Sequence, residues 1–178
     1  MGSEMCIRDR GYVMIDKKMQ KAINDQINNE LHSAYLYLAM SAEATSKGLR
    51  GSGKWFYVQY QEEMVHVMKF FNYLLEQGVD VELAAIAKPK VGFKSLLGML
   101  EATLKHEQFI TKCIHGLMDL AVREKDYATQ VLLQWYITEQ VEEEANDNEI
   151  VGMLRMAGAS TGTLLMIDKQ LGKREFKG

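Results

Sequence analysis

Proline occurs only once in this chain of 178 residues, at Pro89. Average usage of about 5% would give roughly nine prolines in a chain of this length. Because a proline in a helix interior costs about 3 kcal/mol, its near absence leaves long stretches in which helices can run unbroken. The sequence therefore predicts an all-α fold built from long helices.

Capping residues and glycines divide the chain into five expected helices. Aspartate and serine residues suited to N-caps, and glycines suited to helix ends, mark most of the boundaries. The expected helices cover residues 16–45, 52–77, 95–124, 126–157 and 163–171. The segment 79–94, which contains Pro89 and Gly92, has few helix signals and is expected to be extended.

The lengths of the connections predict the topology. Short connections after the first and third helices make two antiparallel hairpins. The link of about sixteen residues between the hairpins is too long for a simple hairpin loop. At about 3.3 Å per residue it can run the roughly 45 Å length of a thirty-residue helix. The prediction is an up-down four-helix bundle with one long crossover between helices two and three, plus a short C-terminal fifth helix.

Composition and charge exclude several classes of function. Hydrophobic residues make up 47% of the chain and charged residues 25%, which argues against disorder. The 21 basic and 24 acidic residues give a net charge of −3 and form no basic block, so nucleic acid is not an expected partner. No window approaches eighteen consecutive apolar residues, so no membrane span is expected. Two cysteines are too few for a disulfide framework, which makes the cytoplasm the expected location.

The first residues are expected to lie outside the folded domain. Residues 1–10 resemble a translated adapter or a cloning scar, and Met14 offers a suitable native start. We therefore assign residues 1–13 to an N-terminal extension and residues 14–174 to the bundle domain. Cys113 is the cysteine within that domain, and core packing is its expected role.

Each of the four long helices carries a glutamate near the middle of the face that should be buried. Apolar positions recur every three or four residues, and Glu30, Glu63, Glu107 and Glu143 interrupt them. The expected stripe of the third helix is Leu97, Leu100, Leu104, Glu107, Thr111, Ile114 and Met118. That of the fourth is Leu132, Tyr136, Glu139, Glu143, Asp147, Ile150 and Leu154.

Such carboxylates are unfavourable in a core unless their charge is compensated. Burying one unpaired carboxylate costs several kcal/mol, four at one level repel each other, and few Lys or Arg residues lie on the stripes. Protonation relieves part of this cost, whereas bound cations neutralise the charges directly. His66 lies one turn from Glu63 on the same helix face. Carboxylates with one imidazole suit Fe(II), Fe(III) and Mn(II), so the pattern predicts a dinuclear metal site.

A single element of this pattern would carry little weight. A lone Glu-x-x-His is common by chance, and a lone glutamate is more often a surface residue. The coincidence of four mid-helix glutamates with the histidine favours the metal site. The other histidines, His32, His106 and His115, lie off the stripes or are isolated, and we expect them to be solvated or locally hydrogen-bonded.

The segments around these residues resemble those of bacterial non-haem ferritins, over about residues 14–174. The matching segments are Asn28-Asn29-Glu30-Leu31, Tyr35-Leu36-Tyr37, and residues 61–66, 105–108 and 133–144. In this order and at these spacings they are specific to that family. Ferritin-like folds are also the standard example of a bundle with one long crossover.

The resemblance implies an iron-storage protein that oxidises Fe(II) to Fe(III) with O₂ or peroxide. It implies iron as the metal and no haem, in a hollow homo-oligomer of 24 subunits with octahedral symmetry. The apolar face of the fifth helix, which includes Leu164 and Ile167, agrees with assembly because it has no obvious partner in a completed bundle. The alternative is that this helix packs back on its own bundle.

The resemblance also assigns roles to individual residues. The first iron site would be formed by Glu30, Glu63 and His66, and the second by Glu63, Glu107 and Glu143, with Gln140 beside it. A third site would be formed by Glu62, Glu139 and Glu142, with Glu143 shared. Tyr37 and Trp135 would be the aromatic residues that supply electrons, and core packing is their alternative role.

The fourth helix favours storage over oxygenase chemistry. It offers Gln140 and Glu143 where a symmetric di-iron enzyme would repeat Glu-x-x-His. The missing imidazole weakens the second site, which suits iron in transit.

Three alternatives follow from the sequence. Bacterioferritin binds haem through a methionine that Met64 would match, but the fourth helix lacks its second histidine. Another di-iron oxidase, such as a rubrerythrin-type peroxidase, would need a Cys-x-x-Cys iron module, which the sequence lacks. A non-catalytic helical bundle that binds a partner protein would tolerate Glu63→Ala or gain stability from it.

Overall fold

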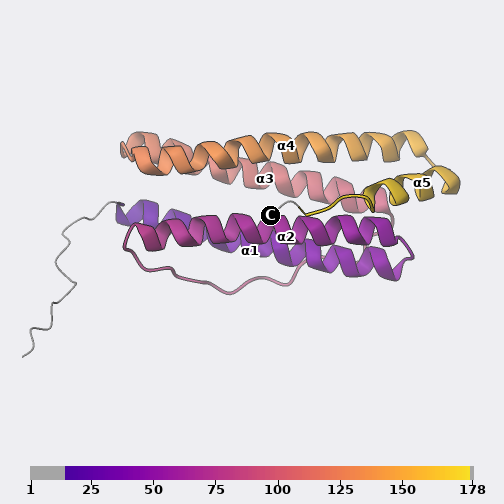
Figure 1. Ribbon diagram of the computed structural model, residues 1–178, viewed down its shortest axis with the longest axis horizontal. Coiled ribbons are helices and arrows are strands. Elements are labelled where there is room, and N and C mark those ends of the chain that lie inside the picture. Colours follow the sequence, from indigo (N-terminus) through magenta and orange to yellow (C-terminus); the bar gives the residue numbers. More distant parts are fainter. Residues whose placement is uncertain (1–14, 177–178) are drawn as a thin grey trace, which may run out of the picture.

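The computed structural model describes residues 15–176, which form five helices and no strand (Figure 1). The helices are α1 (Lys17–Ser46), α2 (Arg50–Glu76), α3 (Leu96–Arg123), α4 (Tyr127–Ala157) and α5 (Thr161–Leu171). The all-α prediction is confirmed. The N-terminal extension assigned to residues 1–13 lies outside the described residues and stays a prediction.

The helices form the expected four-helix bundle with one long crossover. In Figure 1, α1 and α2 form one antiparallel pair, α3 and α4 form the other, and α5 lies across one end. The crossover runs along the outside of the first pair. It is attached to α1 at both ends, since Asn24 Oδ1 accepts from the Glu82 amide at 2.9 Å and the Glu43 carboxylate accepts from the Gly92 and Phe93 amides.

Side-chain caps set most of the helix starts. Asp16, Ser95 and Asp126 each accept a hydrogen bond from an amide in the first turn of the helix that follows. Ser160 does the same for α5, which therefore begins at Thr161 and not at the expected residue 163. No described helix has an apolar stretch long enough to cross a membrane.

The apolar core lies in two clusters at the two ends of the bundle. One cluster includes Ile23, Phe70 and Ile114, and the other includes Met40, Phe56 and Leu100. Between them the four long helices contribute a layer of buried polar side chains. A polar layer between two apolar clusters is where the sequence predicts a metal site.

The buried faces of α3 and α4 differ from the expected stripes. On α3, Leu97, Leu104, Thr111 and Met118 are partly buried, whereas the fully buried positions include Leu96, Met99, Thr103, Ile110 and Leu117. On α4, Leu133 and Gln140 are buried in place of Leu132 and Glu139. Each helix of a bundle contacts two neighbours, so its buried face is wider than one stripe and its centre is fixed by tertiary packing.

The fifth helix packs on its own bundle with part of its surface. The Asp168 carboxylate of α5 accepts hydrogen bonds from the Gly51 and Ser52 amides, at 3.1 and 2.7 Å, and from the Ser52 hydroxyl. These amides belong to the first turn of α2, which has no side-chain cap of its own. α5 buries Ile167 and Leu171, whereas Leu165 and Met166 remain exposed.

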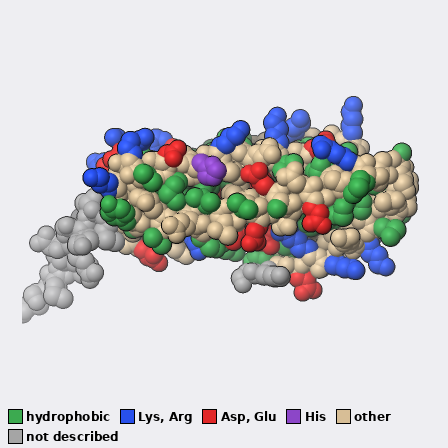
Figure 2. All heavy atoms as spheres, turned by 90° about the horizontal axis from the view of Figure 1, so that it is seen from above, with side chains coloured by type: hydrophobic (Ala, Val, Ile, Leu, Met, Phe, Trp, Pro, Cys, Tyr) green, Lys and Arg blue, Asp and Glu red, His purple; other side chains and the backbone are tan. Residues whose placement is uncertain are grey.

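Charged side chains are spread over the face shown in Figure 2, where basic, acidic and apolar groups alternate along the molecule. Basic side chains lie at several separate places along the edges of this view and do not form one patch. This face therefore has the mixed surface expected from the near balance of acidic and basic residues.

Replacing Gly51 by alanine is expected to release α5. A Cβ at position 51 would lie 1.8 Å from the Asp168 carbonyl oxygen, which is a backbone atom and cannot move aside cheaply. We expect the free energy of unfolding to fall by about 1–3 kcal/mol, the usual range for overpacking. Proteolysis at the C-terminus should become faster. Gly116→Ala on α3 is the matched control, because nothing lies within 4 Å of its Cβ and alanine favours a helix. A Gly51→Ala protein that melts at or above the wild-type temperature would contradict this packing.

Candidate metal centre

Six polar side chains from four helices meet in the middle of the bundle. They are Glu30 of α1, Glu63 and His66 of α2, Glu107 of α3, and Gln140 and Glu143 of α4. Each exposes 6% or less of its surface. The structure therefore buries every residue that the sequence assigns to the first two iron sites.

Glu30, Glu63 and His66 form a group whose geometry is compatible with one metal ion. Each offers a ligand atom, and the three atoms lie within 4.8 Å of one another. Among residues 15–176 they are the one group of three or more acidic, histidine or cysteine residues that meets this condition. Oε2 of Glu30 and Oε2 of Glu63 are buried and accept no hydrogen bond. A cation fits here because it would satisfy both oxygens and suits this mixture of donors.

The Glu107 and Glu143 carboxylates lie on the other side of the centre and are held by neutral donors. Glu107 accepts hydrogen bonds from the Tyr37 hydroxyl and from Nε2 of Gln140, the latter at 3.1 Å. Glu143 accepts from Nε2 of Gln59 at 3.0 Å. These bonds fix the directions of both carboxylates without neutralising their charge.

Burial and the neighbouring carboxylates raise the pKa values of three glutamates in the centre. Burial, and next the neighbouring Glu63, raise the pKa of Glu30 to about 8. Burial and Glu143 raise the pKa of Glu107 to about 7. Burial, Glu107 and Glu143 raise the pKa of Glu63 well above its usual range. Glu30, Glu63 and Glu107 therefore hold protons near neutral pH unless cations replace them.

The structure does not gather the residues expected for a third site. Glu142 is exposed, Glu139 is half-buried, and neither belongs to a ligand group among the described residues. Glu62 accepts a hydrogen bond from the guanidinium of Arg174 at 2.5 Å. Burial raises the pKa of Glu62 to about 7, although Arg174 opposes the shift. The third site stays a prediction.

Two aromatic side chains contact the centre in different ways. Tyr37 is fully buried, and its hydroxyl donates a hydrogen bond directly to Glu107. Trp135 is half-buried, with its ring 5.4 Å from that of His66 and the Lys69 ammonium 4.1 Å from its centroid. Tyr37 thus has the direct contact with a candidate ligand, whereas Trp135 reaches the centre through His66.

His106 is satisfied locally, as expected. Its Nε2 lies 2.7 Å from the hydroxyl of Ser33, and burial lowers its pKa to about 4. His115 is exposed, which also agrees with the prediction.

Three buried polar residues of the site were not singled out from the sequence. Gln26 donates to Glu30 at 2.8 Å, and Gln59 donates to Glu143. Gln26 lies four residues before its own partner, and that spacing could have revealed it, whereas the partner of Gln59 lies on another helix. Asp147 belongs to the expected stripe of α4, and the sequence pattern indicates no role for it. It is fully buried, neither carboxylate oxygen accepts a hydrogen bond, and burial raises its pKa to about 8.

A comparison with protein families agrees with this geometry. A family model described as the ferritin-like domain matches residues 20–157. The chain belongs to the ferritin family. The family implies iron binding, and the donors of Glu30, Glu63 and His66 suit iron. The expected resemblance is therefore confirmed.

Individual members of the ferritin family match nearly the whole chain. A bacterial non-heme ferritin of Campylobacter jejuni is 40% identical over 158 residues, which cover 89% of this chain and 95% of the relative. A bacterial non-heme ferritin of Staphylococcus aureus is 36% identical over 163 residues, which cover 92% of this chain and 98% of the relative. The solved structure of an open-pore ferritin from the archaeon Archaeoglobus fulgidus superposes with a TM-score of 0.90 at 45% identity. The match covers 92% of this chain and 99% of the archaeal chain.

Proposed function

We propose that this chain oxidises Fe(II) to Fe(III) at a di-iron ferroxidase centre within each subunit and stores the product as ferric mineral inside a hollow oligomer. Membership of the ferritin family supports iron storage and ferroxidase activity. The observation that carries the proposal is the buried layer of four glutamates and one histidine, in which two carboxylate oxygens have no hydrogen-bond partner.

The first iron is bound by Glu30, Glu63 and His66, and the second by Glu63, Glu107 and Glu143. Glu63 bridges the two ions, which agrees with the effects of Glu107 and Glu143 on its pKa and with its place in the ligand group of the first site. Gln140 borders the second site, where its amide can hold water or an oxygen species. Tyr37 is placed to supply an electron because its hydroxyl contacts Glu107.

Carboxylates promote oxidation because Fe(III), with its higher charge, gains more from the same ligands than Fe(II). They therefore lower the reduction potential of the bound iron. Two Fe(II) ions supply the two electrons that convert one O₂ and two protons to hydrogen peroxide. Raised carboxyl pKa values mean that iron binding releases protons from the same residues.

The second site is built to let iron leave. On α4, Gln140 and Glu143 stand where a symmetric di-iron site would have the glutamate and the histidine of a second Glu-x-x-His, so the imidazole is missing. Gln140 also donates a hydrogen bond to Glu107. Weaker binding at this site fits a centre that passes Fe(III) on to a mineral.

Storage requires a container, and we expect 24 subunits with octahedral symmetry. The large apolar side chains that α4 and α5 leave exposed, Met156, Leu165 and Met166, support burial against other subunits. No haem is expected, and a reducing cytoplasm is the expected compartment. Met64, the residue that would bind haem in a bacterioferritin, lies in an open groove on α2.

Anaerobic calorimetric titration of the metal-free protein with Fe(II) tests the di-iron proposal. We expect two tight binding events per chain, with a net release of protons that is measured by comparing buffers of different ionisation enthalpy. Binding of one ion per chain, or of none, would contradict the di-iron centre.

A further inference from the structure

Two histidines that the di-iron centre does not use meet where α1 packs against α3. The ring centroids of His32 on α1 and His106 on α3 lie 5.7 Å apart, and both side chains are partly buried. The two helices belong to different hairpins of the bundle (Figure 1). The fold therefore brings two imidazoles together at the junction between the hairpins.

Ser33 determines which nitrogen of His106 carries the proton. The Ser33 hydroxyl donates to the Asn29 carbonyl oxygen at 3.1 Å and lies 2.7 Å from Nε2 of His106. Because the hydroxyl proton is used on Asn29, Nε2 of His106 is the donor to Ser33. Nδ1 of His106 then carries a lone pair, the form in which an imidazole binds a metal ion. Metal-bound histidines are held in the same way, by a hydrogen bond from the other ring nitrogen.

The spacing of the two rings suits ligands of one ion. With Zn–N bonds of about 2.0–2.1 Å and tetrahedral geometry, two imidazoles on one zinc ion have ring centroids roughly 5 Å apart. Small rotations of the two side chains would bring the observed 5.7 Å to that value. Imidazole is a preferred ligand of Zn(II), whereas Mg(II) and Ca(II) prefer oxygen.

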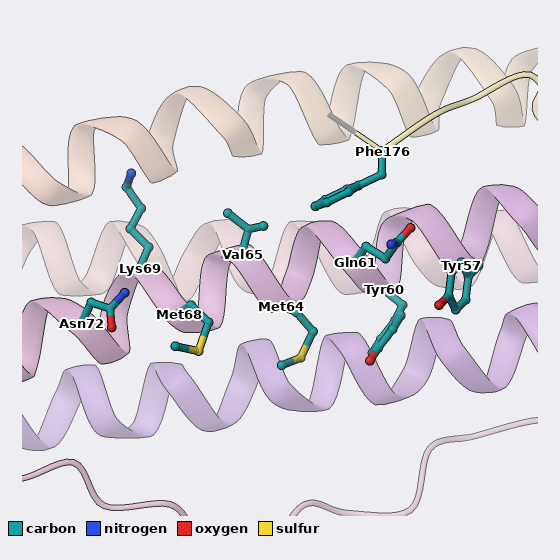
Figure 3. A pocket seen from close by; sticks show the side chains of 9 residues that line it. All are labelled: Tyr57, Tyr60, Gln61, Met64, Val65, Met68, Lys69, Asn72 and Phe176. Carbon is teal, nitrogen blue, oxygen red and sulfur yellow. The ribbon is translucent and has the colours of Figure 1, made fainter. Parts of the chain in front are cut away.

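The groove of about 660 Å³ on α2 offers no competing donors of this kind (Figure 3). Met64 and Met68 lie in it, and none of the nine residues that line it carries an imidazole or a carboxylate. Zinc bound outside the carboxylate centre is therefore not expected in this groove.

We propose that His32 and His106 bind a Zn(II) ion that links α1 to α3, with water completing the coordination. Two residues along an α-helix are separated by about 200° around its axis, so His32 and the candidate iron ligand Glu30 lie on nearly opposite faces of α1. The zinc site is thus separate from the di-iron centre. An ion that binds only the folded chain stabilises it, so zinc at this position holds the two hairpins together.

Calorimetric titration of the full-length, metal-free protein with Zn(II) tests the site. The carboxylate centre also binds Zn(II), so the histidine site is recognised by comparing variants. We expect wild type to bind one more Zn(II) ion per chain than His32→Gln, in which binding at this position weakens by at least about 100-fold. Glu63→Gln should lose binding at the centre and keep this event. His115→Gln is the matched control, because it removes an exposed imidazole from α3 and should bind as wild type does.

Equal numbers of Zn(II) ions bound by wild type and His32→Gln would overturn the proposal. Loss of the event in Glu63→Gln would also overturn it, because the ion would then belong to the carboxylate centre. As a second measurement, Zn(II) should raise the melting temperature of Glu63→Gln more than that of the double variant Glu63→Gln/His32→Gln. Melting temperatures of the metal-free variants show whether a change in binding reflects a change in folding. Failure of the zinc site would leave the di-iron proposal standing, since that proposal uses other residues.

Discussion

Glu63→Gln is expected to remove the rapid phase of Fe(II) oxidation and to lower its initial rate by at least about 100-fold. Loss of a residue that only supports a metal ligand already costs about 10- to 100-fold, and Glu63 is proposed as a ligand of both ions. The amide keeps the size of the side chain but loses its charge, so the iron would bind more weakly and resist oxidation. Stopped-flow absorbance of the ferric product measures the rate.

Glu101→Gln is the matched control for this variant. It removes the same charge from α3, at an exposed pair with Arg155, and should oxidise iron at the wild-type rate. Slow mineral growth is expected to persist in Glu63→Gln if iron still enters the shell. An initial rate within about 2-fold of wild type would refute the assignment and favour a helical bundle without catalytic function.

Metal-free protein is expected to lose stability as the pH rises from about 4.5 to about 8. A carboxyl group whose pKa is higher in the folded state than in the unfolded chain favours folding below the unfolded value. That contribution is lost as the pH rises through the folded value, which is about 8 for Glu30 and Asp147 and about 7 for Glu107. Thermal unfolding in the presence of a chelator, at pH 5 and at pH 8, measures the change.

Glu30→Gln isolates the contribution of one residue to this effect. The amide removes the titrating group, and its oxygen can still accept the hydrogen bond from Gln26. We expect the free energy of unfolding of the metal-free variant to exceed that of wild type by on the order of 3 kcal/mol at pH 8. Near pH 4.5 the two values should match. Anaerobic Fe(II) should stabilise wild type more than the variant at pH 8. A wild-type protein that gains stability between pH 5 and pH 8 would refute the account of buried, uncompensated carboxylates.

The parts of this fold that depend on local chemistry could be predicted from the sequence. Asp16, Ser95 and Asp126 mark helix starts because their side chains accept from amides only a few residues away. The length of the crossover implied two hairpins whatever the details of packing. Glu63 and His66 were found because a spacing of three residues places them on one helix face.

The parts that depend on tertiary packing could not be predicted in the same way. Whether Glu139 or Gln140 faces the core depends on the rotation of α4 against its neighbours, and no spacing within α4 decides between two adjacent residues. The contact between Arg174 and Glu62 joins positions 112 residues apart, and no periodicity connects a C-terminal segment to α2. Gln59 donates to Glu143 on another helix, so no spacing within α2 reveals that contact.

Iron retained per chain is the measurement that tests the central claim most directly. Fe(II) is added aerobically in increments, the protein is passed over a sizing column, and iron is assayed in the protein peak. We predict retention far above two or three irons per chain, in a peak much larger than the 20.3 kDa subunit. Retention that stops near two irons per chain, in a peak the size of one subunit, would contradict storage in a cage.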